Sequence, residues 1–333
     1  MTAVPASARG LIEAAEPPEY RGIARDGVRL LVTDRRTRSH SHARFYDLPS
    51  LLQTGDLLVV NDSATLPAAI VARRIGGEAI ALHVSTMIDA RLWMVEPRGS
   101  VEAGETLRLP GGATATVIAP VEPQRPRLWY VSFQLAVPMY AYLVEFGAPI
   151  AYAYVHSAVP LREYQTHFAR SIGSSEMPSA ARPFTRPIVA RLRGRGIDLA
   201  TITLHCGVAS FEAPELPGTE RFAVPHTTAG RVNAARREGR RVIAVGTTVV
   251  RALETAATDD GVIASQGWTD LFISESHRLR VVDALLSGFH DVSATHRSML
   301  RAFVDTDLLE SAYGEAADHA YRYHEFGDVH LIQ

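Results

Sequence analysis

Val242-Ile-Ala-Val-Gly246-Thr247-Thr248-Val-Val-Arg251-Ala-Leu-Glu254 is the stretch of sequence that decides the fold. Its first four residues are apolar and predict a buried strand, the glycine predicts a turn, and the residues after the turn predict a helix. A strand that leads directly into a helix is typical of an α/β layer architecture. The free N–H groups at such a helix start favour an anion, whereas an N-cap role for Thr247 or Thr248 explains the pattern equally well.

The same alternation of strand and helix patterns extends along the C-terminal half of the chain. We expect strands at residues 201–208, 241–245, 271–274 and 279–285, and helices at residues 186–195, 229–238, 249–258 and 294–304. Residues 306–323 carry apolar side chains at helical spacing and should close this domain with a last helix. The sequence therefore predicts an α/β domain here.

Earlier in the chain the pattern is different, because short β-rich runs follow one another without helical segments. They lie at residues 57–61, 69–73, 79–84, 92–96, 106–109, 113–118 and 128–133. Glycine pairs and proline-rich stretches separate them, which is the turn chemistry of an all-β barrel or sandwich. We expect a small barrel, and 333 residues are long enough for two such domains.

The composition restricts the location of the protein. Residues 1–19 lack the basic start and apolar run of a secretory signal, and prolines, a glutamate and a glycine interrupt the most apolar stretch, residues 135–161. A single cysteine, Cys206, excludes an intrachain disulfide and is most simply a small buried residue. We therefore expect a cytoplasmic protein without a membrane span. The absence of a heptad pattern or a long apolar stripe favours a monomer.

The charge pattern leaves the question of a nucleic-acid partner open. The net charge is −2, so any RNA contact must come from a local patch. All 34 basic residues are arginine, which excludes Schiff-base chemistry by lysine. Arginines cluster at residues 182–195 and 231–241, where either a solvated helix face or phosphate contact explains them.

No metal-ligand spacing is present despite 13 histidines, so we expect no metal in the chemistry.

Three residues stand out as candidates for proton transfer. His205 ends an apolar strand before a glycine, where side chains often meet a cleft, although a lone histidine in such a strand is more often a core residue. Asp283 lies within an apolar run and would need a partner if buried, whereas an orientation towards solvent is the plainer interpretation. His290 would form an acid/base pair with Asp283 if the chain turns back between them.

Arg251 and Glu254 are three residues apart on the predicted helix. They could form a surface ion pair, or Arg251 could instead bind an anionic group of a substrate.

Taken in order, these motifs resemble those of the S-adenosylmethionine:tRNA ribosyltransferase-isomerase family of queuosine biosynthesis, from about Arg25 to Ile332. The matching pieces are Arg25-Asp26, Arg29-Leu-Leu-Val32, residues 45–48, Gly55-Asp-Leu-Leu-Val-Val-Asn61-Asp62-Ser63, Tyr164-Gln165-Thr166, Thr203-Leu-His205, Phe211, residues 244–254, Val281-Val-Asp283-Ala-Leu, Phe289-His290, Thr295, Tyr321-Arg322 and Gly327-Asp328.

The resemblance implies a discontinuous α/β catalytic domain, residues 1–62 and 151–333, that is interrupted by an inserted antiparallel β-barrel, residues 63–150. It also implies a reaction in which S-adenosylmethionine is the co-substrate and donates its ribosyl group, without a metal. A base removes a proton from the ribose carbon next to the sulfonium, and the aminomethyl group of a deazaguanine in tRNA attacks the sugar. Adenine and methionine leave as an epoxycyclopentane forms.

Carried over by position, the resemblance assigns His205, Asp283 and His290 to catalysis. The implied pocket residues for donor and acceptor are Asn61, Thr166, Thr247, Thr248, Arg251, Glu254 and Asp328. Family motifs are altered at residues 178–185, 217–220, 288–295 and 325–328, where two histidines and a lysine of the family pattern are replaced. These changes keep two alternatives open: the same donor chemistry on another acceptor, such as a small molecule, or a non-catalytic paralogue that binds nucleotide or RNA.

Overall fold

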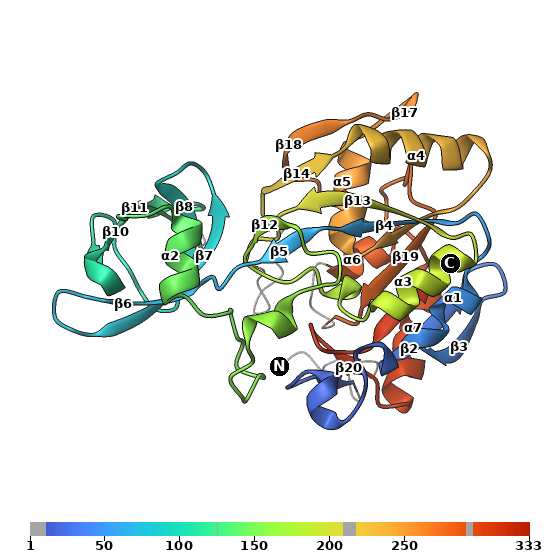
Figure 1. The fold of residues 1–333 in the computed structure, drawn as a ribbon, viewed down its shortest axis with the longest axis horizontal. Helices are drawn as coiled ribbons and strands as arrows, with labels where there is room; N and C mark the ends of the chain where they lie inside the picture. The colour runs from blue at the N-terminus through green and yellow to red at the C-terminus, as the bar shows by residue number, and fades with distance from the viewer. Residues whose placement is uncertain (1–10, 125, 209–217, 291–295) are drawn as a thin grey trace.

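The computed structural model describes residues 11–124, 126–208, 218–290 and 296–333. Figure 1 shows two bodies side by side, a small barrel and a larger body built on a long sheet with helices on both of its faces. The expected fold class, an α/β domain interrupted by an antiparallel barrel, is confirmed.

The barrel is closed, and all of its strand pairs are antiparallel. Its strand order is β10-β11-β8-β7-β6-β9. The strands are β6 (Ala69–Arg73), β7 (Ala79–Met87), β8 (Leu92–Pro97), β9 (Thr106–Arg108), β10 (Thr114–Pro120) and β11 (Trp129–Gln134). Alternate side chains along each strand point inward, and helix α2 (Met139–Phe146) packs on the barrel core. That core draws on residues from Leu66 to Ile150 and on Val208, which supports our proposed insertion of residues 63–150.

The larger body is built on a nine-stranded mixed sheet of order β18-β14-β13-β4-β15-β19-β21-β2-β3. The strands are β2 (Arg29–Asp34), β3 (Ser39–Arg44), β4 (Leu57–Asn61), β13 (Asp198–Leu204), β14 (Glu220–Val224), β15 (Val242–Val245), β18 (Ser265–Thr269), β19 (Ala284–Gly288) and β21 (Val329–Ile332). Strands β13, β4, β15 and β19 are neighbours and run parallel. Their carboxyl ends therefore meet at one edge of the sheet.

Helices cover both faces of this sheet, which explains why β4 and β15 in its centre are almost entirely apolar. Along β4, Leu57 and Val59 belong to one core and Leu58 and Val60 to the other. The first core is closed by α4 (His226–Arg237), α5 (Thr247–Thr255), α6 (His296–Leu300) and α7 (Thr306–Asp318). The second is closed by α1 (Leu48–Leu51) and α3 (Arg186–Gly194).

Short elements complete the described chain. Parallel pairs join β1 (Ile12–Glu13) to β20 (Arg322–Tyr323) and β5 (Ser63–Thr65) to β12 (Ser171–Ser174), and an antiparallel pair joins β16 (Ala257–Thr258) to β17 (Gly261–Val262). The 3₁₀ turns lie at Pro18–Arg21, Arg25–Gly27, Phe45–Asp47, Pro110–Gly112, Leu161–Tyr164 and Ser179–Ala181. In the described ranges, no helix has the length and apolar character needed to cross a bilayer.

Two strand predictions in the α/β part are wrong. Residues 271–274 form no strand, and the strand expected at residues 279–285 is instead β19, which begins at Ala284. The apolar side chains of this region, among them Ile273, Val281 and Val282, pack into the core without backbone pairing. Burial of a loop and burial of a strand produce the same apolar pattern, so periodicity alone does not separate them. The helix expected at residues 294–304 is described only from His296, as α6.

Candidate active site

A cavity of about 840 Å³ lies between the barrel and the carboxyl ends of the parallel strands. Residues that follow β13, β15 and β19 form its wall on the sheet side, and residues of β7 and β8 contribute from the barrel. The carboxyl edge of parallel strands is the usual ligand site of open α/β sheets. The volume also lies within the roughly 300–1,000 Å³ typical of small-molecule pockets.

Helix α5 begins in the cavity wall. Gly246 precedes the helix with φ +96°, a conformation that favours glycine, and Thr247 and Thr248 of the first turn line the cavity. No side-chain hydrogen bond caps this helix start, so the N-cap alternative for the threonines is not realised. The first N–H groups of α5 and its dipole therefore remain available to an anionic or polar group of a ligand.

Arg251, one turn further along α5, forms an ion pair with Glu220 of β14, and both residues line the cavity. Its guanidinium also donates to the carbonyl oxygens of Leu271 (3.0 Å), Gly218 (3.1 Å) and Thr269 (3.2 Å). Burial raises the pKa of the Glu220 carboxyl, and the charge of Arg251 opposes this rise. Arg251 therefore joins several loops of the cavity wall in addition to facing the cavity.

Two carboxylates, each hydrogen-bonded to a tyrosine, line another part of the cavity. Tyr152 donates to Glu176, and Tyr154 donates to Glu325. Burial raises the pKa of the Glu325 carboxyl and, with the neighbouring carboxylates, raises the pKa values of both tyrosines, so the phenols keep their protons at neutral pH. The ring of Tyr154 stacks on His324, with centroids 4.0 Å apart. Tyr152, Glu176, His324 and Glu325 line the cavity here, whereas Tyr154 does not. This wall thus combines carboxylates with aromatic rings, and both kinds of group attract a cation.

His290 also lines the cavity, just beyond the end of β19. Its Nε2 lies 3.3 Å from the hydroxyl of Ser287, and its backbone N–H donates to the Tyr313 hydroxyl at 3.4 Å. Thr247, Thr248, Arg251 and His290 are thus the residues expected from the sequence that the structure brings together around one cavity.

His205 does not line this cavity, although the next two residues, Cys206 and Gly207, form part of its wall. Its Nδ1 lies 2.8 Å from the Ser63 hydroxyl, which in turn accepts a hydrogen bond from the Ser174 hydroxyl at 2.7 Å. Burial, assisted by the charge of Arg221, lowers the pKa of His205. The imidazole is therefore neutral at pH 7 and held in a hydrogen-bonded network.

Asp283 lies at the opposite edge of the sheet, which corrects the expectation that it lines the pocket beside His290. It is exposed just before β19 begins, and its carboxylate accepts a hydrogen bond from the N–H of Val242 at 2.8 Å. The chain does not turn back, because the extended strand β19 separates Asp283 from His290. At about 3.3 Å per residue the seven-residue separation spans roughly 20 Å. The structure therefore forms no Asp283–His290 acid/base pair.

Four other residues expected in the pocket hold the backbone instead of lining the cavity. The Glu254 carboxylate accepts hydrogen bonds from the N–H groups of residues 280–282, and the Asp328 carboxylate accepts from those of Arg29 and Arg322. The Asn61 side chain bonds the backbone of Leu204, and Thr166 accepts from the N–H of Phe168. Cys206 is buried as expected, and burial raises the pKa of its thiol, so it is no nucleophile at neutral pH.

Sequence reasoning did not single out Glu176, Tyr152 or Tyr154, and Glu220 and Glu325 entered it only as residues of the altered motifs 217–220 and 325–328. The tyrosines belong to the apolar stretch that reads as core, and Glu176 lies in a polar loop without periodicity. One signal in the sequence could have indicated the tyrosines. Residues 135–161 combine aromatic and apolar side chains with turn residues, and pockets are lined mainly by aromatic and apolar side chains. The pairing of each tyrosine with a distant carboxylate depends on tertiary structure.

Comparison with known proteins places the chain in a family. Residues 11–332 match the family described as "Queuosine biosynthesis protein". The S-adenosylmethionine:tRNA ribosyltransferase-isomerase of Moorella thermoacetica is 38% identical over 92% of this chain and 93% of its own length. The Thermus thermophilus enzyme of the same name is 36% identical over 95% of this chain and 96% of its own length.

A solved structure agrees with this assignment. The crystal structure of an S-adenosylmethionine tRNA ribosyltransferase from Thermotoga maritima has 29% sequence identity and a TM-score of 0.53, and the match covers 95% of this chain and 98% of that one. The order of the motifs, the barrel inserted in an α/β body and these matches lead to one conclusion. The chain belongs to the S-adenosylmethionine:tRNA ribosyltransferase-isomerase family of queuosine biosynthesis.

Proposed function

We propose that this protein transfers the ribosyl group of S-adenosylmethionine to the aminomethyl-deazaguanine of tRNA and isomerises it, giving epoxyqueuosine with release of adenine and methionine. The names of the relatives support the reaction class. The observation that carries the proposal is the charge arrangement of the cavity, which is lined both by the carboxylates of Glu176 and Glu325 and by the start of α5.

This arrangement suits a substrate that is both cationic and anionic. A sulfonium is a permanent cation, so carboxylates and tyrosine faces stabilise it without a proton transfer. The N–H groups at the start of α5, next to Thr247 and Thr248, are suited to a carboxylate or hydroxyl of the same molecule. The cavity thus offers complementary partners for the opposite charges of S-adenosylmethionine.

The reaction needs a group that accepts a proton from the ribose carbon next to the sulfonium. Of the two histidines that the sequence assigns to catalysis, His290 lines the cavity and His205 does not, so we assign proton transfer to His290. We give His205 a positioning role, because its hydrogen bond to Ser63 fixes the segment that carries Cys206 and Gly207 into the wall. Asp283 has no part in the proposed chemistry, since it lies at the far edge of the sheet.

A tRNA acceptor requires a surface for phosphates, and one basic patch outside the cavity has the required charge. Arg170, Arg186 and Arg193 are exposed. The pKa of the neighbouring His167 is lowered first by the partial burial of its ring and then by the positive charges of these three arginines. Arg182 of the same segment is different, because it is buried in ion pairs with Glu19 and Glu163. We assign the exposed three, and not Arg182, to phosphate contact.

Incubation of the purified protein with S-adenosylmethionine tests the reaction. Adenine and methionine should appear only when tRNA carrying the aminomethyl-deazaguanine is present, and mass spectrometry of the tRNA should show the added epoxycyclopentane. Release with a small-molecule acceptor in place of tRNA would instead support the alternative acceptor. No release with any acceptor, despite binding of S-adenosylmethionine, would support a non-catalytic paralogue and contradict the proposal.

A salt titration tests the tRNA partner separately. Each phosphate contact contributes about −0.9 to the slope of log K against log salt for double-stranded nucleic acid, and less for single strands. Replacement of Arg186 and Arg193 by glutamine should therefore make the slope shallower by one to two contacts, whereas Arg36→Gln, an exposed residue between β2 and β3 and outside both arginine clusters, serves as the control. Binding that does not respond to salt would rule out phosphate contact.

A further inference from the structure

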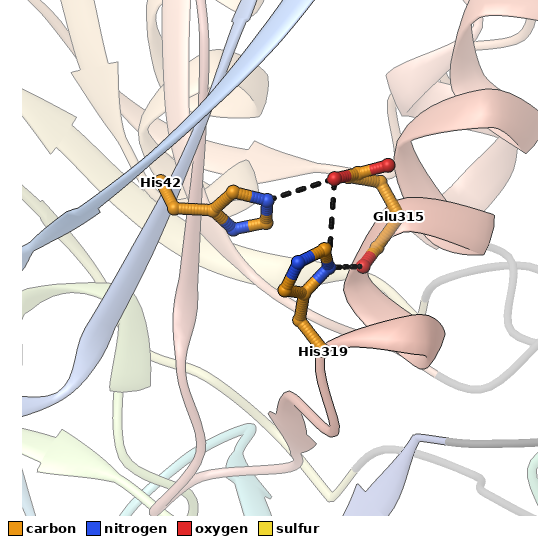
Figure 2. A group of neighbouring side chains, drawn as sticks. All are labelled: His42, Glu315 and His319. Atoms are coloured by element: carbon orange, nitrogen blue, oxygen red, sulfur yellow. Dashed lines mark hydrogen bonds and ion pairs between the residues drawn. The ribbon is translucent and has the colours of Figure 1, made fainter.

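Two histidines and a glutamate come together on the outside of the α/β body, away from the cavity. Figure 2 shows His42 of β3 pointing towards Glu315 of α7 and towards His319, the residue directly after that helix. Each of the three side chains offers one ligand atom, and these atoms lie within 4.8 Å of one another. None of the three lines the cavity, so the cluster has no role in the proposed reaction.

The distances suit a small ion. His42 Nε2 lies 2.9 Å from Glu315 Oε1, and His319 Nδ1 lies 3.5 Å from the same oxygen. Zinc binds nitrogen and oxygen ligands at about 2.0–2.1 Å, so two ligands of a tetrahedral ion are roughly 3.3 Å apart. The separations between pairs of donors, at most 4.8 Å, therefore need to change by no more than about 1.5 Å.

Rigid elements hold these donors in place. Glu315 lies on α7, and His319, four residues later, is the C-cap residue directly after the helix, so the two side chains project from the same side of its C-terminal end. Helix α7 is fixed by the burial of Leu309, Ala312 and Ala316 in the core. A site on packed elements keeps its geometry better than one on loops. Binding would therefore need little ordering of the chain.

An outer partner orients His42. Its Nδ1 lies 2.8 Å from the hydroxyl oxygen of Tyr321, which can accept a hydrogen bond from Nδ1–H and so leave the lone pair of Nε2 to bind a metal. Histidine ligands of metal sites usually have such a partner on the second ring nitrogen. His40, two residues earlier on β3, is engaged differently, because its ring nitrogens bond Thr33 and Ser311.

Without a metal the cluster is a surface ion pair, and that is the competing explanation. His319 Nδ1 lies 2.9 Å from the backbone carbonyl oxygen of Glu315, and this contact must be given up when the ring binds a metal. A surface ion pair contributes little to stability and requires only one histidine. Both imidazoles nevertheless converge on one carboxylate, with ring centroids 4.1 Å apart. Two cationic histidines at this distance repel each other, whereas two neutral ones are ready ligands.

We propose that His42, Glu315 and His319 bind one zinc ion, with water in the remaining coordination position, and that the ion connects edge strand β3 to helix α7. Two imidazoles and one carboxylate suit zinc, whereas magnesium and calcium prefer sites made of oxygen ligands only. The inference is independent of the proposed reaction, which uses other residues.

Isothermal titration of the tag-free, chelator-treated protein with zinc chloride tests the proposal. We expect one ion per chain and a rise in the thermal unfolding temperature when zinc is added. His42→Ala and His319→Ala should each weaken binding at least tenfold and abolish the rise. His226→Ala, which removes an exposed histidine at the start of α4, is the matched control and should change neither.

Two results would overturn the zinc site. One is the absence of saturable binding to the unaltered protein. The other is binding whose stoichiometry and affinity are the same in His42→Ala and His319→Ala as in the control, which would place the ion elsewhere. Because both histidines are exposed, the variants should fold, and circular dichroism without zinc verifies that they do.

Discussion

Arg251 and Glu220 form an ion pair in which the arginine bridges α5 and β14 across the wall of the cavity. The side chains retain only 6% and 14% of their exposure, so removal of either partner leaves a nearly buried charge. Such a loss typically costs about 3–5 kcal/mol, more than the intact pair contributes. This relationship explains why an arginine that the sequence assigns to substrate binding also maintains the site.

A double-mutant cycle tests this coupling. Arg251→Met should lower the free energy of unfolding by about 3 kcal/mol, because Glu220 is left uncompensated. The combined Arg251→Met and Glu220→Gln variant should be destabilised by less than the sum of the single changes, since no charge remains unpaired. Urea unfolding at pH 7 measures all four proteins. Strictly additive losses would show that the two side chains do not interact.

The carboxylates of Glu176 and Glu325 should distinguish a charged ligand from a neutral one. Glu325→Gln and Glu176→Gln keep the size of the side chain and remove its charge, so S-adenosylmethionine should bind about tenfold more weakly, roughly 1.4 kcal/mol. S-adenosylhomocysteine, whose sulfur is neutral, should lose far less affinity. Isothermal titration with both ligands measures the difference. An equal loss for both would mean that the carboxylates do not face the sulfonium.

His290 and Asp283 form a matched pair of substitutions, because the sequence assigns both to catalysis and the structure places only His290 at the cavity. His290→Asn should lower kcat by about 10²-fold or more if the imidazole moves a proton. Asp283→Asn should leave kcat nearly unchanged. Adenine release in the presence of modified tRNA provides the readout, and thermal unfolding verifies that both variants fold. A large loss in Asp283→Asn would contradict the site described above.

The sequence predicts the strands of this protein better than its site, and the reason is physical. Strand β4 and strand β6 begin and end at the predicted residues, because apolar runs between turn residues are a local signal. The pattern groups residues 57–61 with the barrel strands, however, whereas β4 belongs to the nine-stranded sheet, because a local signal does not specify which strands pair. Whether Asp283 and His290 meet depends on the path of the chain between them, and β19 keeps them apart. Glu325 and Tyr154 are hydrogen-bonded although they lie 171 residues apart in the sequence, and no local sequence pattern predicts such a contact.

A substitution at Gly173 tests the role of His205 without changing the histidine itself. A Cβ atom at this glycine would lie 2.6 Å from atoms of the His205 ring, closer than real contacts allow, and φ is +158°. Gly173→Ala should therefore displace the imidazole from Ser63 and lower turnover, with a stability loss of about 1–3 kcal/mol. Gly76→Ala, in an open turn of the barrel, is the control. Normal turnover in Gly173→Ala would remove the positioning role from His205.

His330 should make the protein less stable in mild acid. It is buried on β21, its Nε2 lies 2.7 Å from the hydroxyl of Thr33, its ring stacks on Phe289 with centroids 5.4 Å apart, and burial lowers its pKa from 6.5 to about 3. Between these two values the unfolded chain binds a proton at this histidine and the folded chain does not. The contribution of His330 is therefore complete above pH 6.5 and is lost as the pH falls towards 3, by up to about 1.4 kcal/mol per pH unit. In His330→Phe, which keeps a ring against Phe289, urea unfolding between pH 7 and about pH 5 should show a pH slope shallower by one proton. Equal slopes in the two proteins would mean that His330 is already protonated in the folded state.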